Sequence, residues 1–315
     1  MKPLVVITGP TAVGKTELSI KIAKAIDGEI ISADSIQVYK HMDIGSAKIT
    51  KEEMQGIKHY LVDEFEPDEE FNVHVFKEKT LEYMDKIYEA GKIPIIVGGT
   101  GFYIQSVLYD IQFNDEEIDS AYRKELENIA KEKGNDYLHN MLKEVDEESA
   151  LNIHKNNLKR VIRALEFYKN TGEKISTHNE EQSKNISPYN FVYFVLNDKR
   201  ELLYERINKR VDIMFDKGLV NEVKNLLNMG YTKDLVSMNG IGYKEVVDYI
   251  NGKYSLDETK EIIKRETRHF AKRQLTWFRR EKDVTMVNYF DYDSIDDTLK
   301  YMINTLREKD IIKND

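Results

Sequence analysis

Eight residues near the N-terminus have the types and spacing of a phosphate-binding loop. They read Gly9-Pro10-Thr11-Ala12-Val13-Gly14-Lys15-Thr16 and fit the pattern G-x-x-x-x-G-K-[ST]. The two glycines allow a backbone that aims successive N–H groups at a bound anion, and the ammonium of Lys15 can reach its phosphates. The Thr16 hydroxyl would hold a phosphate oxygen or Mg²⁺. The stretch therefore predicts a site for a polyphosphate, but it does not specify the reaction.

Two predicted elements position this loop. Before it, the β-branched run Leu4–Ile7 is typical of a buried strand, and after it, residues 17–26 carry apolar side chains at helical spacing. The N-terminus of that helix would add partial positive charge beside the phosphates. A glycine turn without a ligand is the alternative. We disfavour it because every fixed position of the pattern and both flanking elements agree.

Asp34 is the second residue that could do chemistry, because it directly follows a predicted strand at 29–33. Its type and place leave three roles open: an outer-sphere partner of Mg²⁺, a general base or acceptor for an incoming nucleophile, and an N-cap for the next turn. No other predicted strand ends in aspartate, so the second carboxylate that is usual in an ATPase is missing. This absence argues against ATP hydrolysis.

The order of the predicted elements indicates an α/β fold. A third strand at 92–97 runs into Gly98–Gly101, and residues 74–90 have helical periodicity. Alternating strands and helices predict a P-loop NTPase-like parallel sheet flanked by helices. Because ligands of such sheets bind beyond the carboxyl ends of the strands, we expect the phosphate loop, Asp34–Gln37 and Gly98–Gly101 to face one cleft.

The middle of the chain has a different pattern, which predicts an all-helical insertion domain. Residues 113–190 show charged helical periodicity, including a helix at 158–169, and end in a polar, loop-like stretch at 177–188. We therefore divide the chain into a first part of the α/β core at 1–112, the insertion at 113–190 and a second part of the core at 191–315.

The second part of the core begins and ends with predicted strands. A β-rich run covers 191–196, and a last strand at 284–289 is expected to rejoin the sheet. Between them, Ser255 and Glu258 form a predicted capping box, which starts a long basic helix reaching Arg280.

Charge is unevenly distributed along this acidic chain, whose net charge is −9. Twelve acidic and five basic residues lie in 113–150, whereas 155–174 carries six basic against two acidic residues and 260–282 carries nine against three. The net charge weakly disfavours a nucleic-acid partner. Two concentrated basic segments can nevertheless bind a polyanion locally.

The composition excludes several classes of site and location. With no cysteine, the chain has no disulfide and no thiolate metal site, and its seven histidines show no metal-ligand spacing. A strand begins almost at Met1, which leaves no room for a signal peptide, and no apolar run approaches the ~20 residues of a membrane helix. We therefore expect a cytoplasmic protein that does not enter a membrane.

Two sets of basic residues have open interpretations. Arg206 and Arg210 lie one helical turn apart beside an apolar stripe, where they form either a pyrophosphate clamp or a solvated charged face; the residues alone favour the solvated face. The second set is a stripe whose spacing suits successive phosphates, namely Lys264, Arg268 and Lys272. After it, Trp277 and Phe278 could stack on a base, although core packing is the better expectation for at least one of them.

Taken together, these stretches resemble the tRNA dimethylallyltransferase (tRNA isopentenyltransferase) family. The specific ones are Ser32–Lys40 with Met42–Gly45 and Ala271–Phe278, while the phosphate loop by itself is generic. Further matching stretches occur in family order, namely Val97–Gly101, Lys159–Glu166 and Ile241–Glu245. The resemblance extends from the first predicted strand to the end of the basic helix.

This resemblance implies a tRNA-modifying prenyltransferase with a nucleotide-binding type of loop. Such enzymes transfer a dimethylallyl group from dimethylallyl diphosphate to N6 of the adenosine just 3′ of certain tRNA anticodons, release pyrophosphate and need Mg²⁺. The implied partners are the tRNA anticodon stem-loop and dimethylallyl diphosphate, and we expect a monomer. The phosphate loop would then hold a diphosphate leaving group, which explains the missing ATPase carboxylate.

The resemblance also implies roles for individual residues. Asp34 would orient the adenine amine and accept its proton, Gly9–Thr16 would bind the diphosphate, and Thr16 would also hold Mg²⁺. Charge that develops on the leaving pyrophosphate would be stabilised by Thr11, Lys15, Thr16 and Arg210. The target base would leave the anticodon-loop stack to reach the diphosphate. The positions implied to touch tRNA are Asp34, Ser35, Ile36, Gln37, Thr100, Arg123, Lys159, Arg160, Val161, Ile162, Arg163, Asn239, Gly240, Ile241, Gly242, Tyr243 and Lys244.

Two departures from the family pattern concern tRNA contacts. The usual Asn-Asp-Pro before the basic insertion helix reads Asn156-Asn157-Leu158, and Asn239 replaces a usual basic residue. Both would alter tRNA contacts without altering the transfer chemistry. The absence of cysteine excludes the zinc finger of eukaryotic members, as expected of a bacterial-type enzyme.

Three other interpretations stay open. The nearest is an adenylate isopentenyltransferase, which acts on free nucleotide and needs neither the insertion nor the basic helix. The others are a P-loop small-molecule kinase and a non-catalytic RNA-binding module. The phosphate loop and Asp34 argue against the last of these.

Overall fold

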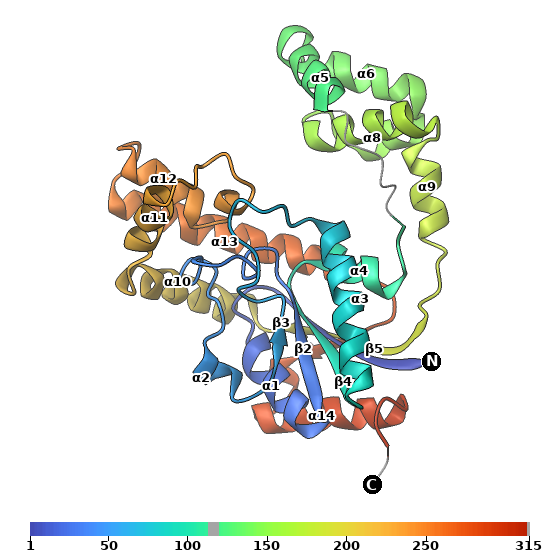
Figure 1. Cartoon of the computed structure of the whole chain (residues 1–315), viewed down its shortest axis with the longest axis vertical. Helices are drawn as coiled ribbons and strands as arrows, with labels where there is room; N and C mark the ends of the chain where they lie inside the picture. Colours follow the sequence, from blue (N-terminus) through green and yellow to red (C-terminus); the bar gives the residue numbers. More distant parts are fainter. Residues whose placement is uncertain (113–119, 314–315) are drawn as a thin grey trace. The chain divides into compact units, whose positions relative to one another are not determined.

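The computed structural model of the chain describes residues 1–112 and 120–313. The chain divides into two compact units, one formed by Met1–Leu108 with Pro188–Asp315 and the other by Tyr109–Ser187 (Figure 1). We call them the α/β unit and the helical unit and describe each by itself. The expected start of the insertion at residue 113 lies outside the described residues, and its expected end at 190 lies inside a strand.

The described part of the α/β unit is built around a six-stranded parallel sheet with the order β3-β2-β4-β1-β5-β6. This confirms the expected fold class. Its strands are β1 (Lys2–Thr8), β2 (Gly28–Ala33), β3 (His59–Tyr60), β4 (Ile93–Gly98), β5 (Tyr189–Asn197) and β6 (Val284–Asn288). As expected, the last strand rejoins the sheet, where it pairs in parallel with β5.

Helices bury both faces of this sheet. Val5 and Ile7 of β1 pack into a cluster that includes side chains of α1 and α14, while the alternate residue Val6 points to the opposite face and is also fully buried. The helix α3 packs against β2 and β4. The helices of this unit are α1 (Lys15–Ala25), α2 (Lys51–Met54), α3 (Val73–Glu89), α4 (Gly101–Leu108), α10 (Arg200–Asp216), α11 (Leu219–Asn228), α12 (Tyr243–Ile250), α13 (Leu256–Phe278) and α14 (Ile295–Glu308), with short 3-10 turns η1 (Ser237–Asn239) and η2 (Tyr289–Asp291).

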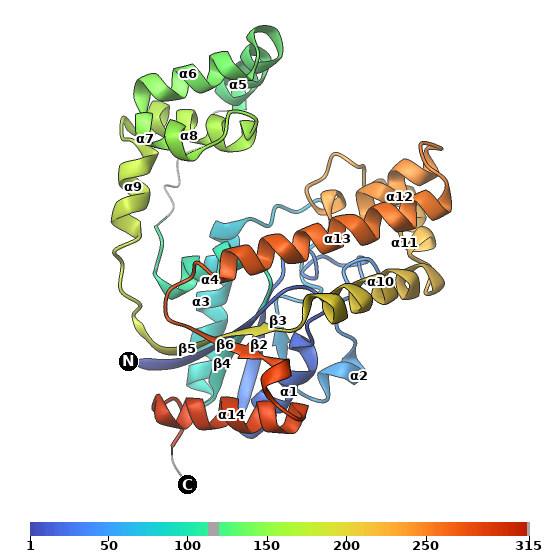
Figure 2. The ribbon, with the colours of Figure 1, turned by 180° about the vertical axis from the view of Figure 1, so that it is seen from behind.

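The long basic helix α13 begins where its sequence predicts. The Ser255 hydroxyl accepts a hydrogen bond from the Glu258 N–H, and the Glu258 carboxylate accepts one from the Ser255 N–H, so the capping box is formed. The helix runs beside α10, as Figure 2 shows from behind, and its C-terminal part reaches α4. This course brings residues of α13 to the carboxyl edge of the sheet.

The described residues of the helical unit form helices packed around their own small core. These helices are α5 (Ser120–Lys133), α6 (Asn135–Val145), α7 (Glu147–Asn152), α8 (Leu158–Thr171) and α9 (Ile175–Gln182). Their core includes Leu126, Leu138, Leu142 and Leu165, all nearly or fully buried. The helix α8 extends to Thr171, two residues beyond its expected end, and Gly172 follows it in the left-handed conformation that caps helices.

The prediction of a loop at 177–188 was wrong for residues 177–182, because α9 covers Ile175–Gln182, and it is confirmed for residues 183–188. This helix has no buried residue, so it lacks the apolar stripe on which the prediction depended. Its start is held instead by Asp146, whose carboxylate accepts hydrogen bonds from the N–H and hydroxyl of Ser176 and of Ser149. Burial alone would raise the pKa of Asp146, but these hydrogen bonds hold it below its ordinary value.

No helix in residues 1–112 or 120–313 combines the length and apolar character needed to cross a lipid bilayer.

Candidate active site

The phosphate loop connects β1 to α1 in the geometry that its glycines predict. Gly14 has a φ of 99° and occupies the N-cap position of α1, so the backbone N–H groups that begin the helix are directed at the loop's concave side. The Lys15 ammonium donates hydrogen bonds of 2.9 Å to the carbonyl oxygens of Gly9 and Pro10. In this position it closes the loop and lies where a phosphate would be bound.

The environment of Lys15 makes its charge responsive to pH. Burial and the nearby charge of Arg210 lower the pKa of Lys15 to about 8, while Asp34 acts in the opposite direction. Without an anion, two cations therefore repel each other beside the loop. A bound polyphosphate would relieve this repulsion and favour the protonated amine.

Three strand ends meet at one small cavity, as expected from the fold. Lys15 and Thr16 follow β1, Asp34 and Gln37 follow β2, and Gly98 ends β4; all five line a cavity of about 60 Å³. The Thr16 side chain is exposed there. The cavity therefore joins a phosphate-binding loop to a carboxylate.

The two oxygens of Asp34 have different surroundings. Oδ1 accepts hydrogen bonds from the Ile36 N–H at 2.9 Å and the Gln37 N–H at 3.2 Å, which fixes the turn after β2. Oδ2 has no hydrogen-bond partner in the described part of the chain. The capping role and the role of acceptor for a substrate amine are thus compatible, because each uses a different oxygen.

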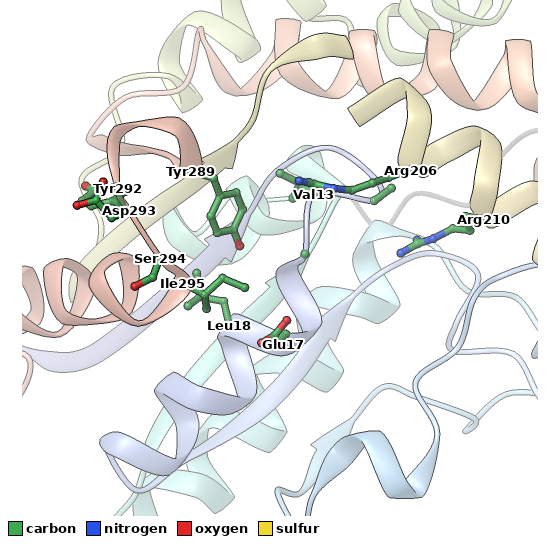
Figure 3. Close-up of a pocket in the computed structure, with 12 residues that line it drawn as sticks. Val13, Glu17, Leu18, Arg206, Arg210, Tyr289, Tyr292, Asp293, Ser294 and Ile295 are labelled. Atoms are coloured by element: carbon green, nitrogen blue, oxygen red, sulfur yellow. The ribbon is translucent and has the colours of Figure 1, made fainter. Parts of the chain in front are cut away.

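A larger pocket, of about 560 Å³, is lined by Ala12, Val13 and Gly14 of the same phosphate loop and by the two arginines of α10. Figure 3 shows Arg206 and Arg210 projecting from α10 toward the loop residue Val13. Tyr289, which no sequence pattern singled out, also lines the pocket, and its hydroxyl lies close to Gly14. Burial raises its pKa to about 12, so the hydroxyl remains a hydrogen-bond donor at neutral pH.

The two arginines of α10 differ in their partners. Arg206 forms a 2.6 Å ion pair with Asp198, whose side chain is almost completely buried. Arg210 has no hydrogen bond or ion pair with any residue of 1–112 or 120–313. Burial lowers its pKa while Glu53 and Asp34 favour its charge. Arg210 is therefore the guanidinium that is available to a ligand.

Asp198 corrects one step of the sequence analysis. It directly follows β5, which ends at Asn197, so a second strand is followed by aspartate, just as β2 is followed by Asp34. The predicted strand stopped at residue 196, which hid this position. Because the carboxylate already binds Arg206 and the Lys199 N–H, its role in the structure is to hold that arginine.

Gln274 of α13 is a site residue that the sequence analysis missed. Its carbonyl oxygen accepts a hydrogen bond from the Thr11 N–H at 2.9 Å, and its amide donates one to the Gly99 carbonyl at 3.1 Å. It thus ties the phosphate loop to the loop after β4. The only available signal was its place in the stretch Ala271–Phe278, which carried the family resemblance but no assigned role.

The aromatic pair after Gln274 serves packing. Phe278 is fully buried, and Trp277 lies against Gly101 with its ring in edge contact with Phe102. The expectation of core packing for at least one of them is confirmed. Phe278 is therefore closed to a base, and Trp277 is partly buried.

The basic stripe of α13 is only partly available to a polyanion. Lys264 forms ion pairs with Asp212 at 2.9 Å and Glu261 at 3.1 Å, and Arg268 donates a 2.6 Å hydrogen bond to Asn208. Lys272 is exposed. The first two side chains therefore brace α13 against α10.

In the α/β unit, two predicted RNA-contacting turns lie together. The turn after β2 contains Ser35, Ile36 and Gln37, and the side chain of Ile36 lies close to Gly240 of the turn before α12. The Gln37 amide donates to the carbonyls of residues 46 and 47, so this side chain braces a loop.

The turn before α12 is exposed at its two ends and buried in between. Asn239 and Lys244 are exposed, Ile241 is partly buried, Gly242 is buried and Tyr243 is fully buried. Thr100 is partly buried at the start of α4.

In the helical unit, the predicted positions separate into surface and core. Lys159, Arg160 and Arg163 are exposed on α8, whereas Val161 and Ile162 are buried in the unit's core. Burial of these two side chains contradicts a direct RNA contact by them, because the apolar face of α8 must pack inward. Arg123 forms a two-bond ion pair of 2.8 and 2.7 Å with the buried carboxylate of Glu166, so its guanidinium has a structural partner.

Comparisons with known proteins agree with this geometry. A family model described as IPP transferase matches residues 37–281. The tRNA dimethylallyltransferase of Lachnoclostridium phytofermentans is 61% identical over 99% of this chain and 100% of that protein, and that of Acetivibrio thermocellus is 55% identical over 97% and 98%.

Solved structures of similar proteins belong to the same kind of enzyme. The full-length tRNA isopentenylpyrophosphate transferase of Bacillus halodurans superposes with a TM-score of 0.74 at 43% identity and covers 98% of each chain. A eukaryotic dimethylallyltransferase acting on tRNA gives a TM-score of 0.83 at 29% identity, over 98% of this chain and 80% of that one. With a family model that spans most of its length and near-full-length relatives at these identities, the chain belongs to the IPP transferase family.

Proposed function

We propose that this chain is a tRNA dimethylallyltransferase. It transfers the dimethylallyl group of dimethylallyl diphosphate to N6 of the adenosine 3′-adjacent to the anticodon of certain tRNAs and releases pyrophosphate. The observation that carries the proposal is the cavity in which the phosphate loop, Lys15 and the uncommitted Oδ2 of Asp34 meet. An anion site and a proton acceptor in one cavity suit a transfer in which a diphosphate leaves and an amine attacks.

The residues of the site divide this reaction between them. The allylic C–O bond breaks and its electron pair stays on pyrophosphate, while the N6 lone pair forms the new C–N bond. Oδ2 of Asp34 orients the amine and takes up the proton that N6 loses. The loop N–H groups, Lys15 and Arg210 stabilise the growing negative charge on the leaving group, and the Thr11 hydroxyl would act with them.

Mg²⁺ fits the site as an ion held mainly by the substrate. No cluster of three or more His, Cys, Asp or Glu side chains in residues 1–112 or 120–313 could bind a metal by itself. The exposed Thr16 hydroxyl lies in the same cavity as Asp34 and would supply one ligand, with diphosphate oxygens and water supplying others. When bound, the ion neutralises negative charge on the diphosphate.

The tRNA would be held by exposed cations and by the two adjoining turns of the α/β unit. Lys159, Arg160 and Arg163 are available on α8, and Lys244 is available beside the turn before α12. Such side chains contact phosphates and give affinity with little sequence information. Selection of the adenosine then falls to the turn that carries Asp34, where the extruded base would enter the cavity.

One assay tests this function against its nearest alternative. The full chain is incubated with dimethylallyl diphosphate labelled in its allyl group, Mg²⁺ and either tRNA or AMP. Label in tRNA alone is the expected result. Label in AMP alone would instead make the chain an adenylate isopentenyltransferase and would contradict the proposal.

A further inference from the structure

Glu222 of α11 joins three segments that lie far apart in the sequence. Its Oε2 accepts hydrogen bonds from the N–H groups of Asp43 at 3.0 Å and Ile44 at 2.7 Å. Its Oε1 accepts one from the Gly45 N–H at 3.0 Å and one from the Tyr243 hydroxyl at 2.8 Å. All four bonds use one partly buried carboxylate.

A carboxylate is the group that this arrangement requires. Three successive N–H groups point at one carboxylate, two at Oε2 and one at Oε1, which is a geometry that favours an anion. An ionised carboxylate can accept at both oxygens, whereas the amide of glutamine accepts at one and donates from the other side. Gly45 is fixed as well, because a Cβ at this position would lie 2.5 Å from Cζ of Tyr243. The segment therefore packs directly against the tyrosine ring.

Two series of contacts connect the segments held by Glu222 to the proposed RNA-binding turns. Along the first, the loop after Gly45 accepts hydrogen bonds at Ser46 and Ala47 from the Gln37 side chain, and the Gln37 N–H is held by Asp34. Along the second, Tyr243 is fully buried at the first position of α12, directly after the turn Gly240–Gly242. That turn lies against Ile36 of the turn after β2, so both series of contacts end where these two turns meet.

We propose that Glu222 is a positioning residue for RNA: by holding Asp43–Gly45 against Tyr243 it sets the turn after β2 and the turn before α12 at the spacing that receives the tRNA. The inference rests on the proposed function, because it assigns Glu222 to the tRNA side of that site. None of the four bonds reaches the phosphate loop, so Glu222 should leave diphosphate binding unaffected.

The test compares three variants of the full chain. Glu222→Gln keeps the size of the side chain but breaks the four-bond pattern, and Tyr243→Phe removes one of the four bonds while keeping the ring. The control is Glu205→Gln, an exposed position on α10 that makes the same change in net charge. Steady-state transfer to tRNA gives KM and kcat, and calorimetry with inorganic pyrophosphate reports on the phosphate loop.

We expect Glu222→Gln to raise KM for tRNA about tenfold or more, since hydrogen bonds to a charged group are lost, and Tyr243→Phe to raise it by a smaller factor. In both variants kcat at saturating tRNA and pyrophosphate affinity should stay close to those of the wild type, and Glu205→Gln should match the wild type throughout. A residue with a purely structural role would lower the melting temperature without this selective rise in KM.

The inference is overturned if both variants keep the wild-type KM for tRNA, or if pyrophosphate affinity falls in parallel with it. If Glu222→Gln does not fold, the KM for tRNA and the pyrophosphate affinity of Tyr243→Phe test the inference instead. A wild-type chain that does not label tRNA would overturn the proposed function and this inference with it, whereas labelled tRNA with unchanged KM in both variants overturns this inference alone.

Discussion

At the scale of single residues, the proposed chemistry depends on Asp34, whose two carboxylate oxygens have different roles. Oδ1 of Asp34 holds the turn after β2, and Oδ2 is left for the substrate. A single residue thus combines the capping role and the acceptor role between which its sequence position could not decide. The same turn carries Gln37, so loss of Asp34 by truncation would disturb structure as well as chemistry.

Asp34→Asn separates these two effects. The asparagine oxygen can still accept the two backbone hydrogen bonds, but its amide cannot take up a proton. We expect a single-turnover transfer rate about 10²–10⁴ times lower, with unchanged pyrophosphate affinity. Asp34→Ala should be at least as slow. Near-normal turnover of Asp34→Asn would remove Asp34 from the mechanism.

Lys15 gives the site a pH dependence with a definite sign. Its pKa is lowered to about 8 in the free protein, and a bound anion must raise it, so binding takes up a proton above pH 8. Pyrophosphate affinity should therefore be highest below pH 8 and fall by up to about tenfold per pH unit above it. The measurement is the ratio of dissociation constants for wild type and Lys15→Met between pH 6 and 10, in which the ligand's own titration cancels. A ratio independent of pH would show that Lys15 does not contact the phosphates.

The two arginines of α10 should differ in importance. Arg210 is uncommitted, and losing a donor that stabilises a developing charge costs roughly 2.7–4 kcal/mol in comparable sites. Arg210→Ala should therefore reduce kcat strongly. Arg206→Ala should reduce it less, because Arg206 pairs with Asp198. The opposite ranking would show that Arg206 is the ligand of the pyrophosphate.

The site residues that could be predicted from the sequence are those whose sequence neighbours mark them. The glycine loop, Lys15 and Asp34 are each recognisable from the strand that precedes them. Gln274 and Glu222 are not, because their partners lie 263 and 179 residues away along the chain and no short pattern records that contact. Asp198 was missed because a strand end was placed one residue early.

At the scale of elements, α13 is the helix that completes the phosphate site. Gln274→Leu would remove both hydrogen bonds from a nearly buried side chain and leave the Thr11 N–H and the Gly99 carbonyl without their partner. We expect a loss of about 1–3 kcal/mol in the free energy of unfolding, measured by urea titration, together with weaker pyrophosphate binding. Unchanged values for both would show that water or another side chain replaces Gln274.

Elements with a clear apolar period were predictable, and those held by polar contacts were not. The strands and α13 have buried stripes or a capping box that mark their course. By contrast, α9 has no buried face and depends on Asp146, more than 25 residues before it. The strand β3 is only two residues long, too short to show any alternation.

At the scale of the whole molecule, a separate helical unit carries three of the exposed cations proposed to bind tRNA. Replacing Tyr109–Ser187 by a short linker should leave an α/β unit that folds and binds pyrophosphate, because all strands of the described sheet lie outside the deletion. Binding of tRNA should be lost. If tRNA affinity survives, α13 and the turns of the α/β unit carry recognition by themselves.

The salt dependence of the full chain provides the matching control. Binding through phosphates should weaken by ~0.7–0.9 log units per log unit of salt for each contact. A flat response would contradict recognition by the basic residues of α8. The sequence indicated this unit through its change of pattern. The helical spacing of Leu158, Val161, Ile162 and Leu165 would also have placed Val161 and Ile162 on the inward face of α8, but the family resemblance assigned these positions without regard to which face they occupy.

We propose that the phosphate loop of this protein holds a leaving group while a carbon group is transferred. The most direct measurement uses dimethylallyl diphosphate labelled both in the allyl carbon and in phosphorus, incubated with the chain, Mg²⁺ and tRNA. We expect the carbon label to enter tRNA and all of the phosphorus label to be released as pyrophosphate. Phosphorus label in the acceptor would contradict this proposal and would assign the loop to phosphoryl transfer.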